Sequence, residues 1–445
     1  PVWGGHDQPW ILLWSKNEKP DLETQAFHLA TPVREDELAR RGEFRLDYQS
    51  AYQVTVQSIL DSSWLCKALA IGSTLDVQVM EKLCLAAASQ SIGGFWDKCN
   101  LVSGNGFSLK NGNKSPPQWL LKLPVFETKE GMAESSLLQS QTFAELYGSR
   151  KIESARAEEL YKCPLIVIPQ ALGPDRGVST GYCFWNDNVC FSQSYFGYSA
   201  FGHDEYRLVM SLLNVLVHSS LFRHFCYMRS SRVGASRRTF LKEDLDAFPF
   251  PHLSDLNKEQ RTQALALSDM LETRQTKDLQ ALDAFVGGLF GLSKAEQQVV
   301  ADTVTFNGPY AVVRKQAMYA VPPDEAATFV RTLEQAIQPF FKAVGQKVNA
   351  KLVPRLDGDW QQPWAFVTVL LDDDTWEPSK KLITSLIGEA SASAASRLVM
   401  PLPEGGLIIG LLNKRRFWTR SRARLCALHI AEEHLERCFP LPERK

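Results

Sequence analysis

Basic side chains gather in one stretch of the sequence that contains no acid. Between residues 221 and 242 the basic residues are Arg223, Arg229, Arg232, Arg237, Arg238 and Lys242. The chain as a whole is balanced, with 49 Lys and Arg against 50 Asp and Glu, so the clustering is local. Guanidinium and ammonium groups neutralise phosphates, and Arg also pairs with base edges. Small residues such as Ser236 between them would let the backbone approach a polyanion.

Two further clusters have the same character. One spans residues 414–424 and interleaves Phe417 and Trp418 with cations; its basic members are Lys414, Arg415, Arg416, Arg420, Arg422 and Arg424. The other is smaller and adds amide side chains; its members are Lys110, Asn111, Asn113 and Lys114. Three such clusters predict nucleic-acid binding, in which the 414–424 cluster contacts phosphates. The alternative for any one of them is a solvated charged face. In the first cluster we expect Arg232, Arg237 or Arg238 to read a base.

The sequence offers no recognisable catalytic or metal-binding constellation. It contains neither a phosphate-binding GxxxxGK[ST] loop nor a GxSxG nucleophile elbow, and the GNG at 104–106 lacks a third glycine. His218 and His224 are expected to pack on or near a helix. His429 and His434 are five residues apart, which does not place both on one helix face, so no metal site is predicted. The nine cysteines occur singly and predict reduced, mostly buried thiols in a cytoplasmic protein.

The elements around the first cluster have a mixed pattern. Apolar runs at 163–169 and 188–198 predict strands, and residues 205–228 have helical periodicity. The segment 103–119 is rich in Gly, Asn, Ser and Pro, which predicts a loop. After the basic cluster, the apolar, proline-containing segment 247–251 is expected to anchor the chain in the core. The order of strands and helices predicts an α/β (mixed α+β) fold.

The remaining elements extend this picture to several domains. Residues 10–14, WILLW, predict a buried strand, and the helical run that follows offers Leu65, Leu69, Val79, Leu83 and Leu85 to a core. Residues 257–305 are helical, with a stop at Gly291 and a capping box from Ser293 to Glu296. Residues 306–445 predict a separate α/β piece, with a turn at 404–406 and a helix beginning at Thr419. No apolar run is long enough to span a membrane.

Three segments of residues 93–305 belong together: CPLIVIPQ, NVCFSQSYFGYSA, and the helix with Leu212, Leu213 and Asn214 followed by the basic loop and Phe248–Pro251. With these segments, residues 93–305 resemble the target-recognition part of adenine-N6 DNA methyltransferases of type I and type IIG restriction–modification and phage-defence systems. GNGFSLKNGNK and LDAFVGGLFGLSKAEQQVV are similar to the opening and to the following helices of that part. QPWILLWSKNEKP is similar to the last strand of the methyltransferase sheet.

This resemblance implies a domain order and a partner. It implies the end of a methyltransferase-like sheet with a helical connector in 1–90 and a target-recognition domain in 91–255. A helical segment follows in 256–305, and a smaller C-terminal α/β domain occupies 306–445. The family's (Asn/Asp)-Pro-Pro-(Tyr/Phe) motif and its glycine-rich S-adenosylmethionine loop are absent from the sequence. The resemblance therefore implies that methyl transfer, with S-adenosylmethionine, belongs to a catalytic domain upstream or in a partner chain, while this chain binds double-stranded DNA.

Two other functions remain open from the residues alone. The same surfaces would serve a non-catalytic DNA- or protein-binding subunit of a bacterial defence complex. An RNA-binding protein is the other alternative, in which exposed rings of Tyr195, Phe196 and Trp418 would stack on bases.

Overall fold

A computed structural model describes most of the chain. The described residues are 21–22, 25–31, 51–127, 141–148, 150–172, 181–233, 239–273, 279–308, 310–342, 345–355, 363–372, 376–392, 396–402 and 405–434. The predicted strand at 10–14 lies outside these residues, as do Ser236, Arg237 and Arg238 of the predicted DNA contacts.

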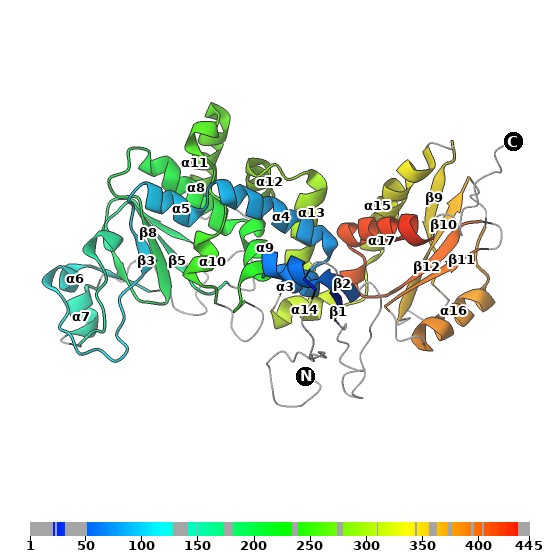
Figure 1. The fold of residues 1–445 in the computed structure, drawn as a ribbon, viewed down its shortest axis with the longest axis horizontal. Coiled ribbons are helices and arrows are strands. Elements are labelled where there is room, and N and C mark those ends of the chain that lie inside the picture. The colour runs from blue at the N-terminus through cyan, green and yellow to red at the C-terminus, as the bar shows by residue number, and fades with distance from the viewer. Residues whose placement is uncertain are drawn as a thin grey trace. The chain divides into compact units, whose positions relative to one another are not determined.

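The chain divides into two compact units. The central unit comprises residues 78–300, and the terminal unit combines residues 1–77 with 301–445. Both contain helices and sheets, which confirms the predicted mixed α/β, multi-domain fold (Figure 1). The predicted domain boundaries at 90, 255 and 305 divide the chain more finely and stay predictions.

The central unit contains a four-stranded antiparallel sheet with the order β3-β8-β5-β6. Its strands are β3 (Ser103–Asn105), β8 (Tyr195–Ser199), β5 (Leu165–Pro169) and β6 (Tyr182–Phe184). The β-branched run of β5 confirms the strand predicted at 163–169. The run at 188–198 forms two strands instead of one, because a turn at 192–194 separates β7 (Cys190–Phe191) from β8. Strand β7 pairs in parallel with β4 (Val125–Phe126).

The two faces of this sheet meet different parts of the central unit. Leu165 and Val167 face a core formed largely by residues 107–126 and 143–161, which include α6 (Gln118–Lys122) and α7 (Phe143–Tyr147). On the other face, Tyr198 lies edge-on to Trp96 of α5 (Ile92–Lys98), with ring centroids 5.2 Å apart. Helix α8 (Tyr206–His218) also contacts β5 (Figure 1).

The predicted helix at 205–228 is broken into α8 and α9 (Ser220–Arg229). The backbone of Ser219 is extended, and its Oγ accepts a hydrogen bond from the Phe222 amide at 3.1 Å, which starts a new helix. Both helices are almost wholly buried. In the described part of the chain no single helix has the length and apolarity to cross a membrane; this pair passes that test only jointly and is bent by 65°.

The predicted hydrophobic anchor after the basic cluster is confirmed. Phe248 and Phe250 are buried, and the Ile92 amide donates to the Phe248 carbonyl at 2.9 Å. The Phe248 ring lies edge-on to Phe222 and Phe225, with centroids 5.3 and 5.2 Å apart. The chain therefore returns firmly to the helical core after the loop, through the short helix α10 (Lys242–Asp246).

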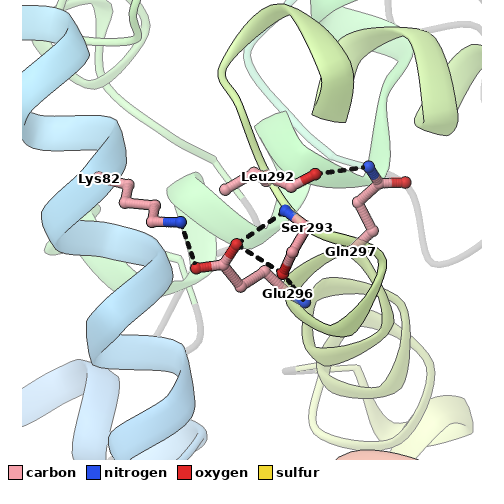
Figure 2. A network of polar contacts seen from close by, with 5 residues as sticks. All are labelled: Lys82, Leu292, Ser293, Glu296 and Gln297. Atoms are coloured by element: carbon pink, nitrogen blue, oxygen red, sulfur yellow. Dashed lines mark hydrogen bonds and ion pairs between the residues drawn. The ribbon is translucent and has the colours of Figure 1, made fainter.

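The helical segment at 257–305 is confirmed as α11 (Lys258–Glu272), α12 (Gln280–Leu289) and α13 (Lys294–Phe306). Gly291 has φ of 64°, which suits the predicted helix stop. The Ser293–Glu296 capping box is also confirmed, because the amide and Oγ of Ser293 donate to Glu296 at 2.8 Å and the Glu296 amide donates to Ser293 Oγ at 3.3 Å. Figure 2 shows Glu296 also paired with Lys82 of α4 (Thr74–Ser89), at 2.7 Å.

The prediction is wrong for one residue of α4 that was expected in the core. Val79 and Leu83 are buried, but Leu85 is 76% exposed. Leu85 follows Val79 by six residues, which turns it about 240° around the helix and away from the core.

The terminal unit contains a second antiparallel sheet with the order β11-β12-β10-β9. Helices α15 (Pro323–Lys342) and α17 (Arg420–Glu433) lie on one side of it and α16 (Lys380–Ala392) on the other (Figure 1). Gly405 and Gly406 of the predicted turn at 404–406 have φ of 93° and 98°, whereas residue 404 lies outside the described residues; Thr419 caps α17 as predicted. The strands and remaining helices are β9 (Val348–Leu352), β10 (Trp364–Leu371), β11 (Arg397–Pro401), β12 (Leu407–Leu412), β1 (Ala26–Ala30), β2 (Ala51–Thr55), α2 (Val56–Asp61), α3 (Leu65–Ile71) and α14 (Ala311–Ala317).

Candidate nucleic-acid interface

Two loops that are distant in the sequence lie side by side in the central unit. Residues 108–114 run beside residues 150–156, and we call them the basic loop pair. Lys114 and Ile152 exchange two backbone hydrogen bonds of 3.1 and 2.9 Å, and the Ser108 amide donates to the Ser154 carbonyl at 3.0 Å. A Cβ on Gly112 would lie 2.4 Å from the Lys151 carbonyl oxygen, so the close approach needs glycine.

The basic loop pair carries five exposed cations against one acid, Glu153. The cations are Lys110, Lys114, Arg150, Lys151 and Arg156. Glu153 accepts a hydrogen bond from Ser108 Oγ at 2.6 Å. Lys110 and Lys114 are thus exposed, as DNA contacts must be. Arg150, Lys151 and Arg156 were missed from the sequence because about forty residues separate them from the first loop.

The amide residues of the first loop have different settings. Asn111 and Asn113 are both exposed, and Asn111 also occupies the tip of the turn with φ of 56°. Asparagine adopts this left-handed conformation more readily than most residues. A backbone requirement therefore explains Asn111 without a ligand.

Three further amide residues meet at one end of the central sheet: Asn105, Gln170 and Gln193, which we call the amide rim. Antiparallel pairing brings the end of β3, the end of β5 and the start of β8 together there. Asn105 Nδ2 and Gln170 Nε2 both donate to the Gln193 carbonyl, at 3.4 and 2.5 Å. Arg156 Nε donates to the Gly106 carbonyl at 3.2 Å, so the rim adjoins the basic loop pair.

The first basic cluster ends beside the amide rim. Arg229 and Arg232 are exposed where α9 ends, and the Arg229 guanidinium lies 5.8 Å from the centre of the Phe225 ring. After the residues that are not described, Thr239 pairs with Ala171, and the Phe240 amide donates to the Gln170 carbonyl at 2.9 Å.

Two basic residues counted in that cluster are not available to a ligand. Arg223 is only 1% exposed because it lies within the buried helix α9. Lys242 pairs with Asp246 at 2.5 Å and lies over the Tyr198 ring.

Most basic side chains of the 414–424 cluster are buried or form contacts within the terminal unit. Arg415 makes two hydrogen bonds to Glu325, of 3.0 and 2.5 Å, and lies over the Phe306 ring. Burial, together with the nearby charge of Arg422, lowers the pKa of Arg416 to about 10. Arg422 donates to the Gly72 carbonyl at 3.3 Å, and burial also lowers the pKa of Arg424. Lys414 is half-buried, and Arg420 is exposed.

Two carboxylates lie in the same region as these cations. Arg416 and Arg422 line a small pocket together with Asp76 and Asp302. Asp302 accepts hydrogen bonds from the amide and Oγ of Ser421 at 2.9 and 2.7 Å, and Asp76 accepts one from Thr303 at 2.6 Å. Buried acids contributed by residues before 78 and after 300 therefore lie beside these cations, and the charge of Asp302 raises the pKa of Arg424 against the larger effect of burial.

The aromatic residues expected to stack on bases are not exposed. Tyr195, Phe196 and Trp418 are 7%, 2% and 2% exposed, so this expectation is wrong. The Tyr195 and Phe196 rings belong to β8, and Trp418 Nε1 donates to the Leu412 carbonyl at 3.0 Å. Apolar packing and an internal hydrogen bond satisfy these side chains.

The described histidines at 218 and 224 and the described cysteines are buried or half-buried. His218 and His224 are buried, as expected for packing, and burial lowers the pKa of His218 to about 4. The eight described cysteines are free thiols; three of them are buried and five are half-buried. No group of three His, Cys, Asp or Glu side chains in the described ranges is arranged to hold a metal ion.

Comparison with known proteins adds no relative to this description. No protein-family model matches the chain, and a search of curated proteins finds no significant match.

Proposed function

We propose that this chain is the sequence-specific DNA-recognition part of an adenine-N6 DNA methyltransferase in a restriction–modification or phage-defence system. The proposal takes its class from the sequence resemblance and its DNA-binding surface from the geometry of the central unit. The methyl-transfer step, with S-adenosylmethionine, is assigned to a catalytic domain outside these residues. A bacterial cytoplasmic location, where the DNA is, accords with this role.

One observation carries the proposal most strongly. Hydrogen bonds link the basic loop pair, the amide rim and the end of the first basic cluster in that order: Arg156 donates to Gly106, Asn105 and Gln170 donate to Gln193, and Phe240 donates to Gln170. Exposed cations that can neutralise phosphates therefore adjoin one side of a rim that presents the exposed Gln193 amide, and cations beside such a group are typical of a DNA-reading surface. We call this strip the candidate interface.

The proposed mechanism follows from that division. Lys110, Lys114 and Lys151 contact phosphates and fix the register of the duplex. Amide and guanidinium groups, including Arg232, read base edges in a groove. The target adenine is then flipped into the separate catalytic domain, because methylation of N6 requires the base outside the stack.

Salt dependence of DNA binding tests the proposal. The 445-residue chain is titrated with a random-sequence duplex between about 50 and 300 mM salt, as parent and as a Lys110→Ala, Lys114→Ala, Lys151→Ala triple variant. Each lost phosphate contact should flatten the plot of log affinity against log salt by about 0.9, and three contacts by about 2.7.

A matched control removes three exposed lysines elsewhere in the central unit, Lys98, Lys258 and Lys294. This control should keep the parental slope. Absence of salt-dependent DNA binding by the parent, or equal flattening in both triple variants, would overturn the proposal. A parent that binds proteins of a defence complex but no DNA would favour the interaction-subunit alternative.

A further inference from the structure

Gln193 occupies a distinctive place in the candidate interface. It lies in the turn between β7 and β8, and its side chain is exposed. Within the part of the chain that the structure describes, its side-chain amide makes no hydrogen bond, since only its backbone takes part. Both the carboxamide oxygen and the NH₂ group are therefore free to bind a ligand together.

The backbone that presents this amide is fixed on several sides. The Gln193 amide donates to the Phe107 carbonyl at 2.8 Å, and its carbonyl accepts from the side chains of Asn105 and Gln170. The Tyr195 amide closes the turn on Ser192 at 3.1 Å. A backbone held in this way loses little freedom on binding, which favours precise recognition.

Close packing below the turn adds to this rigidity. Phe191, directly before the turn, is fully buried. A Cβ on Gly106 would lie 1.9 Å from the Phe191 carbonyl oxygen, and one on Gly197 would lie 2.2 Å from its ring. The strands that flank the turn therefore pack at van der Waals distance, and this close packing restricts their movement.

The three rim amides differ in what they can offer. Asn105 and Gln170 use their NH₂ groups on the Gln193 carbonyl, so each has lost a donor and serves to position the turn. Gln193 keeps one donor and one acceptor. A free carboxamide pairs bidentately with adenine, donating to N7 and accepting from N6 in the major groove.

We propose that Gln193 is a specificity-determining residue that reads an adenine in the DNA target, with Asn105 and Gln170 as its positioning residues. The inference rests on the proposed DNA-recognition function and adds which base is read and which residue reads it. The cations of the basic loop pair, next to the rim through Arg156 and Gly106, hold the duplex against the turn.

Binding-site selection from a randomised duplex pool tests this assignment. The full chain is used as parent, Gln193→Ala, Gln193→Glu and a control, Gln263→Ala. Gln263 is an exposed glutamine of α11 in the same unit and outside the candidate interface. Thermal unfolding of each variant verifies that all four proteins are folded.

The expected results differ among the variants. The parent should prefer adenine at one position; Gln193→Ala should lose that preference by about 5- to 150-fold, the range for one bidentate base contact. Gln193→Glu should shift the same position toward cytosine, because a carboxylate accepts from cytosine N4. The control should select the parental site.

Two failures can be told apart. If the parental chain binds no DNA, the proposed function is overturned and this inference with it. If the parent selects a site and both Gln193 variants keep its preference at every position, DNA recognition stands and the assignment of Gln193 is wrong.

Discussion

The guanidinium of Arg415 is enclosed by groups of its own unit. Glu325 accepts two hydrogen bonds from it, and the Phe306 ring lies 5.2 Å from its centre. Lys110, by contrast, is exposed on a loop tip. A paired cation gains little from a phosphate, because it would have to give up its carboxylate first.

Replacement of Arg415 by alanine should therefore affect stability and leave DNA binding alone. We expect the free energy of unfolding to fall by about 1 kcal/mol, since the pair is bidentate but partly solvated. Urea denaturation measures this, and the salt slope of DNA binding should stay parental. Lys315→Ala, an exposed position of α14 in the same unit, is the control and should change stability by less than about 0.5 kcal/mol. A flatter salt slope with unchanged stability for Arg415→Ala would restore the phosphate contact predicted from the sequence.

His218 should make the protein sensitive to mild acid. It is buried in α8, its Nδ1 lies 2.8 Å from the Asn214 carbonyl oxygen, and burial lowers its pKa from 6.5 to about 4. Between these two values the unfolded chain binds a proton that the folded chain does not. Stability from this group is therefore present above pH 6.5 and is lost as the pH falls toward 4.

The change can be isolated by comparing the parent with His218→Gln. The parent should lose about 2 kcal/mol more than the variant between about pH 7 and pH 5, in urea unfolding at both pH values. Equal losses in the two proteins would show that His218 is protonated in the folded state.

The start of α13 is an element held by local hydrogen bonds and by one ion pair (Figure 2). Burial raises the pKa of Glu296, and hydrogen bonds from Lys82 and Ser293 more than offset this, so that the pKa is lowered overall. The carboxylate thus caps its own helix and ties α4 to α13 within the central unit.

Loss of the cap should weaken this element measurably. Ser293→Ala removes the side-chain acceptor of the Glu296 amide and should cost about 1 kcal/mol of unfolding free energy. Lys294→Ala, at the next and exposed position, should stay within about 0.5 kcal/mol of the parent. Denaturant unfolding compares the two; indistinguishable midpoints would mean that the capping contacts add no net stability.

The basic loop pair depends on the absence of a side chain at Gly112. A methyl group there would meet the Lys151 carbonyl, so Gly112→Ala should separate the loops, cost about 1–3 kcal/mol and weaken DNA binding. At Gly288 in α12 a methyl group would have nothing within 4 Å, and Gly288→Ala should stabilise by about 0.5–1 kcal/mol. Unfolding and DNA titrations of both variants check this; parental DNA affinity in a destabilised Gly112→Ala protein would separate the loop pair from DNA binding.

At the scale of the molecule, the terminal unit is assembled from both ends of the described chain. Asp76, from the segment before 78, accepts from Thr303, and Arg422 donates to the Gly72 carbonyl. Arg415 and Arg422 of the 414–424 cluster bond within this unit, whereas the candidate interface lies in the central unit.

The 445-residue chain should bind DNA without methylating it. The sequence contains neither the Pro-Pro catalytic motif nor the S-adenosylmethionine loop of the resembled family. Incubation with S-adenosylmethionine carrying a labelled methyl group should leave no label in duplex DNA. Incorporation by the purified chain would contradict the division of labour that we propose.

Structural features that depend only on neighbouring residues, such as strands and helix ends, were determined by the sequence itself. The strand at 163–169, the stop at Gly291, the cap at Ser293 and the helix beginning at Thr419 each follow from residues within a few positions. Backbone hydrogen bonding and side-chain periodicity are local, so such patterns predict these elements directly.

Exposure and apposition were decided only by the tertiary structure. Trp418, expected to be exposed, is buried, because a residue distant in the sequence, Phe329, packs against its ring. The loop of Lys110 meets the loop of Arg150 and Lys151 through backbone pairing across about forty positions, which no local pattern encodes. Three basic clusters alike in composition therefore separate into an exposed interface and an internal network, because burial and pairing depend on contacts between residues far apart in the chain.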